Sequence, residues 1–122
     1  MITITPVALV RNTIEDFDYS QWDEIHSEIK LIKPFDESYL AQLKVESMVQ
    51  VIYHFHRASR YQLSKDNKDV FAHRNSPRPN NLAVSIVSLK RISDDVLVVQ
   101  GLDAINGTPV FDIKPFGKED LP

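Results

Sequence analysis

The chain has 122 residues, which is enough for one domain, residues 1–122, with a single core. It contains no cysteine, so disulfides and cysteine-bearing metal sites are excluded. Its formal net charge of −3 argues against a general nucleic-acid coat, because non-specific binding to phosphates needs a positive potential.

The N-terminal region, MITITPVALV, alternates between apolar and polar residues and predicts a strand over Ile2–Arg11, around Pro6. No basic region stands ahead of its apolar residues, so we expect no signal peptide. The longest apolar runs are too short to span a bilayer, and we therefore expect a cytoplasmic protein with no membrane segment. The polar, acidic segment Thr13–Glu24 is expected to be irregular.

Strand patterns dominate the rest of the chain. Alternation and β-branched residues predict strands over His26–Ile32, Met48–His56, Leu82–Ile92, Val96–Leu102 and Pro109–Lys114. One short helix is expected after Asp36, a good N-cap, because Tyr39, Leu40 and Leu43 recur at helical spacing.

The predicted fold is therefore mainly β: a single small antiparallel or mixed β-barrel with one short helix. Closure into a barrel is the simplest way for so many strands in so few residues to avoid open edges. The sequence has no alternating strand–helix pattern and no glycine-rich phosphate loop, so a doubly wound nucleotide-binding fold is not expected.

Charge is distributed unevenly along the chain. Residues 54–78 carry six Lys or Arg and two Asp, a balance of +4, whereas the remaining residues carry 8 Lys or Arg and 15 Asp or Glu, a balance of −7. Such a local excess of positive charge suits an anionic ligand. The alternative is a solvated loop without a ligand.

The first candidate constellation is the run His54-Phe55-His56-Arg57 at the end of a predicted strand. Two histidines at i and i+2 share a strand face and could bind a metal. No third ligand is apparent nearby in the sequence, so we expect hydrogen-bonding histidines and no metal site.

The second constellation is the stretch HRNSPRPNN, His73–Asn81, which contains two arginines and two prolines but no glycine. The prolines restrict the backbone around Arg74 and Arg78, and pre-ordered arginines lose less entropy when they bind a carboxylate or phosphate. A surface turn is an equally good reading, because Asn, Ser and Pro are common in turns.

The third constellation is GLDAINGTPVFDIKP, Gly101–Pro115. Asn106-Gly107 predicts a tight turn, and Asp103 and Asn106 flank it with side chains that can accept hydrogen bonds from a polar ligand such as a ribose. The alternative is a hairpin in which Asp103 and Asn106 only stabilise the turn. Asp112 and Lys114 share a strand face and could form an ion pair.

Taken in order, these segments resemble one known family. VFAHRNSPRPNNLAVSIVSL is similar to the family pattern V-F-A-T-R-S-x-x-R-P-N-P-I-G-x-S-x-V-x-L, and GLDAINGTPVFDIKPF is similar to G-L-D-x-x-D-G-T-P-V-x-D-I-K-P-Y. His56-Arg57 resembles the family's F-H-Q, and PFDESYLAQLKVES resembles its short helix. The family is TrmO, a group of S-adenosylmethionine-dependent tRNA methyltransferases, and the resemblance covers most of the chain.

The resemblance implies a small β-barrel, a homodimer, S-adenosyl-L-methionine as cofactor and tRNA as partner. The methylated atom would be the exocyclic nitrogen of threonylcarbamoyl-adenosine beside the anticodon. Cofactor contacts carried over from the family fall on His56, Arg57, Arg74, Val84, Asp103, Ala104, Ile105 and Asn106.

For the reaction itself, Asp103, His56 and His73 are candidates for handling the proton. Arg74 or Arg78 could hold the threonyl carboxylate, and we expect Arg74 to contact the cofactor and Arg78 to be structural or to face the substrate.

The chain also departs from the family pattern. The acidic segment TIEDFDYSQWDE stands where the family usually has a P-R-Q element, and we expect a short form without the C-terminal domain of larger members. Two alternatives therefore stay open. The protein could be a non-enzymatic module that binds S-adenosylmethionine or a nucleotide, or a methyltransferase with a different substrate.

Overall fold

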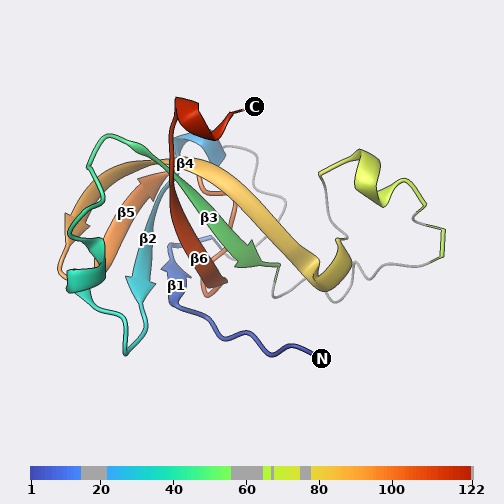
Figure 1. Ribbon diagram of the computed structural model, residues 1–122, viewed down its shortest axis with the longest axis horizontal. Helices are drawn as coiled ribbons and strands as arrows, with labels where there is room; N and C mark the ends of the chain where they lie inside the picture. The colour runs from blue at the N-terminus through green and yellow to red at the C-terminus, as the bar shows by residue number, and fades with distance from the viewer. Residues whose placement is uncertain (15–21, 56–64, 67, 75–77, 122) are drawn as a thin grey trace.

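The computed structural model describes residues 1–14, 22–55, 65–66, 68–74 and 78–121. Six antiparallel strands close into a barrel in the order β1-β2-β5-β4-β3-β6 (Figure 1). The strands are β1 (Ala8–Arg11), β2 (His26–Leu31), β3 (Met48–His54), β4 (Leu82–Ser93), β5 (Val96–Gln100) and β6 (Pro109–Phe116). The predicted fold class is thus confirmed.

The barrel is held together by the alternation that predicted its strands. Every second side chain of β2, β3 and β5 is buried, and these side chains meet inside the barrel. The fully buried members include Ile29, Val49, Val51, Leu97 and Val99. Removal of this apolar surface from water is the main stabilising contribution to such a small fold.

The first strand is shorter than the sequence predicts. The expected strand over Ile2–Arg11 begins only at Ala8, and Ile2 and Ile4 are exposed. The neighbouring strand β2 ends at Leu31, opposite Ala8, so residues before Ala8 have no β2 partner. In addition, Pro6 has no N–H that could donate to a neighbouring strand. The prediction failed because alternation records which side chains are apolar but not where a partner strand ends.

The expected helix is a single 3-10 turn, Glu37–Leu40. Asp36 caps it as predicted, since its carboxylate accepts hydrogen bonds from the backbone N–H and the hydroxyl of Ser38. Leu40 is buried against the barrel while Tyr39 is exposed, so one turn is enough to bury the apolar contact. Further 3-10 turns cover Trp22–Glu24, Val70–Ala72, Pro79–Asn81 and Lys118–Asp120.

The segment between β5 and β6 contains the predicted tight turn at Asn106-Gly107, where Gly107 has φ 87° and Thr108 donates its N–H to the carbonyl of Ile105. The turn does not close a hairpin. β5 pairs with β2 and β4, whereas β6 pairs with β1 and β3. The hairpin alternative is therefore wrong, and residues 101–108 cross one end of the barrel as a loop.

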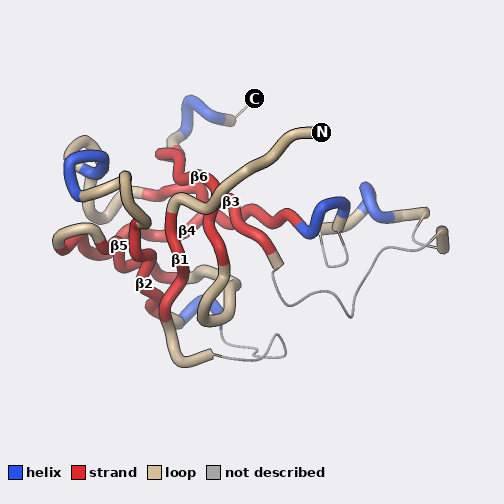
Figure 2. Tube along the Cα trace, turned by 90° about the horizontal axis from the view of Figure 1, so that it is seen from below, coloured by secondary structure: helices blue, strands red, loops and turns tan. Residues whose placement is uncertain are grey.

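A charged appendage extends from the barrel. We call its described residues, 65–66, 68–74 and 78–81, the lobe. Figure 1 and Figure 2 both show the lobe beyond the start of β4, away from the other strands. β4 connects the lobe to the barrel, because it follows directly after residue 81 of the lobe. Within the barrel, β4 pairs with β3 from Leu82 to Ser88 and with β5 from Ser88 to Ser93. No helix within the described residues is long and apolar enough to cross a membrane.

The core assignment can be tested with one substitution at two positions. Ile29→Ala removes a fully buried side chain and should lower the free energy of unfolding by about 2–5 kcal/mol, since it leaves a cavity. Ile4→Ala, at a 57% exposed residue, should change it by about 0.5 kcal/mol or less. Urea denaturation measures both. Equal losses at the two positions would contradict the burial described here.

Candidate functional site

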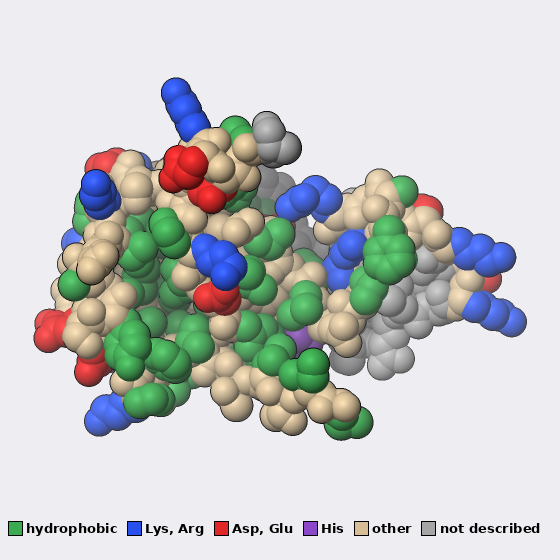
Figure 3. All heavy atoms as spheres, viewed as in Figure 1, with side chains coloured by type: hydrophobic (Ala, Val, Ile, Leu, Met, Phe, Trp, Pro, Cys, Tyr) green, Lys and Arg blue, Asp and Glu red, His purple; other side chains and the backbone are tan. Residues whose placement is uncertain are grey.

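A pocket of about 820 Å³ lies between the lobe and the barrel. This volume lies within the range of small-molecule sites. Figure 3 shows Lys and Arg side chains over the lobe on the viewed face. Four groups of residues line the pocket: Ile52 and Tyr53 of β3 with the following Phe55; Phe71, His73, Arg74 and Arg78 of the lobe; Leu82, Ala83, Val84 and Ser85 of β4; and Asp103.

The two arginines of HRNSPRPNN both line this pocket but differ in their bonding. One terminal nitrogen of Arg78, Nη1, donates to the carbonyl oxygens of Val70 and His73, each at 2.5 Å. Arg78 therefore fastens the 3-10 turn at Val70–Ala72 to the start of β4. Arg74 is exposed and forms no hydrogen bond or ion pair with any residue that the structure describes. Within the described part of the chain, its guanidinium is therefore available to a ligand.

Asp103 brings the opposite charge into the pocket. Its side chain is open to the pocket space, yet the surrounding atoms exclude enough water to raise the pKa of its carboxyl group above the ordinary value. Gly101, with φ 93°, turns the chain out of β5, and the buried Leu102 and Ala104 on either side of Asp103 fix its backbone. Among the described residues, no hydrogen-bond donor or cation is bonded to the carboxylate.

His73 and Val84, two further predicted residues, also line the pocket. His73 has its Nε2 3.9 Å from a carboxylate oxygen of Asp69, an exposed residue of the lobe. Val84 is 37% exposed and contributes an apolar wall. The pocket therefore combines two cationic side chains, a carboxylate, an imidazole and apolar surface, which is the composition expected of a site for a polar ligand with an apolar part.

Other predicted residues do not line the pocket. The side chains of Ala104 and Ile105 are buried in the barrel, at 3% and 0% exposure, so only their backbone could reach a ligand. The carboxamide oxygen of Asn106 accepts a hydrogen bond from the backbone N–H of Asn12, at 3.1 Å. His56 and Arg57 lie outside the described residues.

The metal alternative gains no support from the described part of the chain. His54 packs edge-on against Phe111, with ring centroids 6.1 Å apart, and does not line the pocket. No group of three or more His, Asp or Glu among the described residues is arranged to hold a metal ion.

Sequence reasoning missed several residues that build the site. Tyr53 and Ser85 line it from neighbouring strands, with their hydroxyl groups 2.8 Å apart. Phe71, 83% exposed, stands at its edge as part of the lobe. The available signal for Tyr53 was a hydroxyl-bearing residue on the inward row of a strand whose other inward residues are valines.

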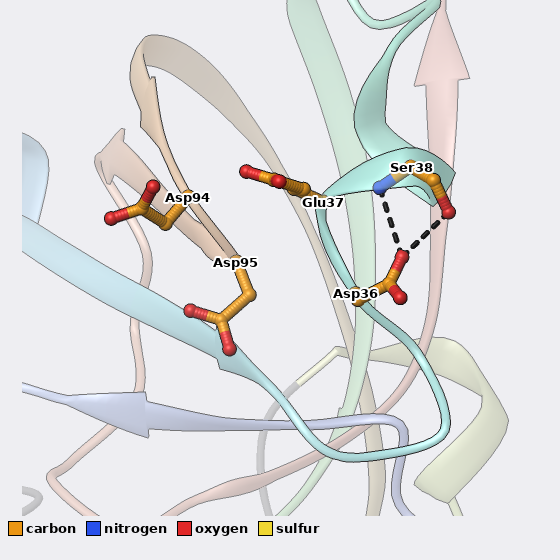
Figure 4. Close-up of a pocket in the computed structure, with 5 residues that line it drawn as sticks. All are labelled: Asp36, Glu37, Ser38, Asp94 and Asp95. Atoms are coloured by element: carbon orange, nitrogen blue, oxygen red, sulfur yellow. Dashed lines mark hydrogen bonds between the residues drawn. The ribbon is translucent and has the colours of Figure 1, made fainter.

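A second, smaller hollow is acidic (Figure 4). It has a volume of about 390 Å³ and is lined by Asp36, Glu37, Ser38, Asp94 and Asp95. Two of these carboxylates already have partners, since Asp36 binds Ser38 and Asp95 forms an ion pair with Lys30 at 2.5 Å. These contacts lower the pKa of both carboxyl groups. The carboxylates of Asp36 and Asp95 in this hollow therefore stabilise the local protein structure.

Known proteins are similar to this chain in both sequence and fold. The family model of the tRNA-methyltransferase O N-terminal domain matches residues 18–120. A probable S-adenosyl-L-methionine-binding protein of Methanothermobacter thermautotrophicus is 34% identical, over 94% of this chain and 90% of its own length. The human tRNA (adenine(37)-N6)-methyltransferase is 29% identical over 66% of this chain but only 20% of its own length.

The fold comparison agrees with the sequence comparison. The crystal structure of TrmO from Pseudomonas aeruginosa superposes with a TM-score of 0.82 at 28% identity, over 98% of this chain and 57% of the other. This chain thus spans little more than half of that TrmO. The match to the family model and the shared fold lead to one conclusion: the chain belongs to the TrmO N-terminal domain family.

Proposed function

We propose that the chain binds S-adenosyl-L-methionine in the pocket between the lobe and the barrel and is a methyltransferase. The observation that carries this proposal is the pair of opposite charges, Arg74 and Asp103, that line one pocket with neither bonded to another described residue. S-adenosylmethionine has both an anionic carboxylate and hydroxyl groups, which match these two side chains. The names of several relatives support the same cofactor.

The residues of the pocket fit this ligand in chemical type. The guanidinium of Arg74 would bind the carboxylate of the cofactor, and the carboxylate of Asp103 would accept hydrogen bonds from the ribose hydroxyls. Apolar walls formed by Val84 and Phe71 would pack against the adenine and exclude water. We extend the proposed contacts to His56, Arg57 and the backbone of Ala104, Ile105 and Asn106, which the family resemblance implies.

The chemistry needs little beyond alignment from the protein. S-adenosylmethionine supplies an activated methyl group and a good leaving group. The residues of this chain would hold the acceptor nitrogen in line and take up its proton. Asp103 and His73 are the candidates in the described pocket, and the raised pKa of Asp103 makes its carboxylate a stronger base than an ordinary aspartate.

We propose tRNA as the substrate and threonylcarbamoyl-adenosine as the modified nucleoside, with methylation of its exocyclic nitrogen. The lobe supports this choice, because it belongs to the stretch of residues 54–78 with a net charge of +4. The family description and the human relative, named for the N6 nitrogen of adenine 37, point to the same class. Arg78 would face the substrate with the guanidinium nitrogens that the turn does not use. Such a substrate would place the protein in the cytoplasm.

A second copy of the chain is the proposed partner. The outer face of β3 and β4 carries exposed apolar side chains, among them Met48, Val84 and Ile86 at 40%, 37% and 46% exposure. Exposed apolar side chains gathered on one face of a sheet commonly mark a protein interface, and we call these three residues the apolar strip. Because Val84 belongs to both the strip and the pocket, a homodimer formed there would place the pocket near the interface.

The alternative function is a binding module without catalysis. The relative from Methanothermobacter thermautotrophicus, nearly all of which this chain matches, is named only for binding S-adenosyl-L-methionine. The net charge of −3 is a second reason to consider a binding module. A methyltransferase with a different substrate is the other alternative, because the acidic segment at Thr13–Glu24 would repel phosphates if it lay beside the site. The experiments below separate these outcomes.

Removal of the free guanidinium should weaken cofactor binding. Arg74→Ala should raise the Kd for S-adenosylmethionine about 10- to 100-fold, because a charge-assisted hydrogen bond to the carboxylate is lost. Lys68→Ala is the matched control, since it removes one positive charge from the lobe at an exposed residue that does not line the pocket. Isothermal titration calorimetry measures both. An unchanged Kd for Arg74→Ala would remove Arg74 from the site.

The proposed substrate predicts transfer of a labelled methyl group to tRNA that carries threonylcarbamoyl-adenosine. Transfer to unmodified tRNA should be slower by a factor of about ten or more, because the threonyl carboxylate would no longer be bound. Affinity for tRNA should also fall as salt rises. Cofactor binding without transfer would favour the binding module. A flat salt response with transfer to another acceptor would favour a different substrate.

The proposed homodimer predicts a sedimentation mass of two chains. Ile86→Lys places a charge in the apolar strip and should shift the mass to one chain, whereas Ile4→Lys, at an exposed residue outside the strands, should leave it unchanged. A wild-type protein that sediments as one chain at micromolar concentration would contradict the proposal.

A further inference from the structure

Tyr53 is an exception in the barrel core. The other buried residues of β3 are Val49 and Val51, and Tyr53 continues their inward row at 2% exposure. Its hydroxyl oxygen is 2.8 Å from the hydroxyl of Ser85 and 2.9 Å from the backbone carbonyl oxygen of Asp103. One phenol therefore connects β3, β4 and the loop at residues 101–108.

The direction of these two hydrogen bonds follows from their partners. A carbonyl oxygen only accepts, so the single proton of Tyr53 is donated to Asp103, and the hydroxyl of Ser85 donates to the oxygen of Tyr53. Burial raises the pKa of Tyr53 to about 12. The phenol therefore keeps its proton near neutral pH and remains a donor to Asp103.

This bond acts on the residue that carries the negative charge of the pocket. The backbone carbonyl of Asp103 points to Tyr53, inside the barrel, while its carboxylate lines the pocket. Leu102 and Ala104 are buried on either side, and the carbonyl of Ala104 accepts a hydrogen bond from Asn12, so the backbone carbonyl of Asp103 is the group that Tyr53 adds to these anchors. The hydrogen bond from Tyr53 thus fixes the backbone of the same residue that carries the carboxylate.

We propose that Tyr53 is a positioning residue for the cofactor site, which holds the carboxylate of Asp103 in the orientation that accepts the hydroxyl groups of the ligand. This inference rests on the proposed function. Tyr53 itself does not reach the ligand through its hydroxyl, because both hydrogen bonds of that group are made within the protein. Its effect on binding passes through Asp103.

A double-mutant cycle tests this route. Tyr53→Phe removes only the hydroxyl and should raise the Kd for S-adenosylmethionine about 3- to 10-fold, the value of one hydrogen bond. The same change in an Asp103→Asn background should have a clearly smaller effect, because the oriented carboxylate is already absent. Tyr39→Phe is the matched control, since Tyr39 is 62% exposed and does not line the pocket. Calorimetry supplies the four Kd values of the cycle and that of the control.

Two results would overturn the proposal. Tyr53→Phe could leave the Kd at the wild-type value, or it could raise the Kd equally with aspartate and with asparagine at residue 103. The second result would mean that Tyr53 supports the fold in general and not Asp103. Thermal unfolding of each variant shows whether the barrel itself is intact.

A measurement without cofactor separates this proposal from the proposed function. Burial raises the pKa of the Asp103 carboxyl group, and a side chain that is no longer held in place would be less buried on average. In a carbon-13 NMR titration, Tyr53→Phe should move that pKa back toward the ordinary value, whereas Tyr39→Phe should not. If wild type binds no S-adenosylmethionine but this shift occurs, the proposed function fails and the positioning role stands. If wild type binds the cofactor and no shift occurs, the positioning role fails alone.

Discussion

The register between β3 and β4 is the constraint on which the site depends. Tyr53 lies opposite Ala83, and Ile52 lies opposite Val84, within a ladder of seven paired residues. Because side chains alternate between the two faces of a strand, a slip of one residue in β3 would turn Tyr53 out of the barrel and bring Ile52 inside. The alternating valines of β3 prevent that slip, since it would expose them to water. Core packing thus fixes a polar group at the pocket.

The loop at residues 101–108 is held on its other side by Asn12, just after β1. The carboxamide nitrogen of Asn12 donates to Ser27 and to the carbonyl of Ala104, both at 2.9 Å, and its oxygen accepts from the N–H of Ile14. The backbone N–H of Asn12 donates to the side chain of Asn106. These bonds satisfy polar groups beneath the loop that burial would otherwise penalise. Asn12 and Tyr53 therefore hold two successive carbonyl groups of the segment that carries Asp103.

The sequence predicted the barrel well because its main signal is local. Alternation in residues such as Val49 and Val51 shows directly which side chains are buried. It could not show that β1 begins only at Ala8, since that depends on where β2 ends. It also could not show that the side chain of Asn106 accepts a hydrogen bond from Asn12, because the two residues are 94 positions apart in the chain. Contacts of this kind depend on the closed topology, which no local pattern records.

The two arginines of HRNSPRPNN illustrate how one local pattern serves two purposes. Arg78 makes two hydrogen bonds to carbonyl groups of the lobe, and so satisfies two backbone acceptors there. That contact ties residues 70–73 to the start of β4, and Arg74 follows them directly. Arg74 can therefore line the pocket without a bonded partner among the residues that the structure describes. A cation that is fixed by its neighbour and left unpaired loses less entropy when it binds an anion than one on a free loop. The interpretations of this stretch as a turn and as a ligand site are therefore compatible, because Arg78 fastens the residues that precede Arg74.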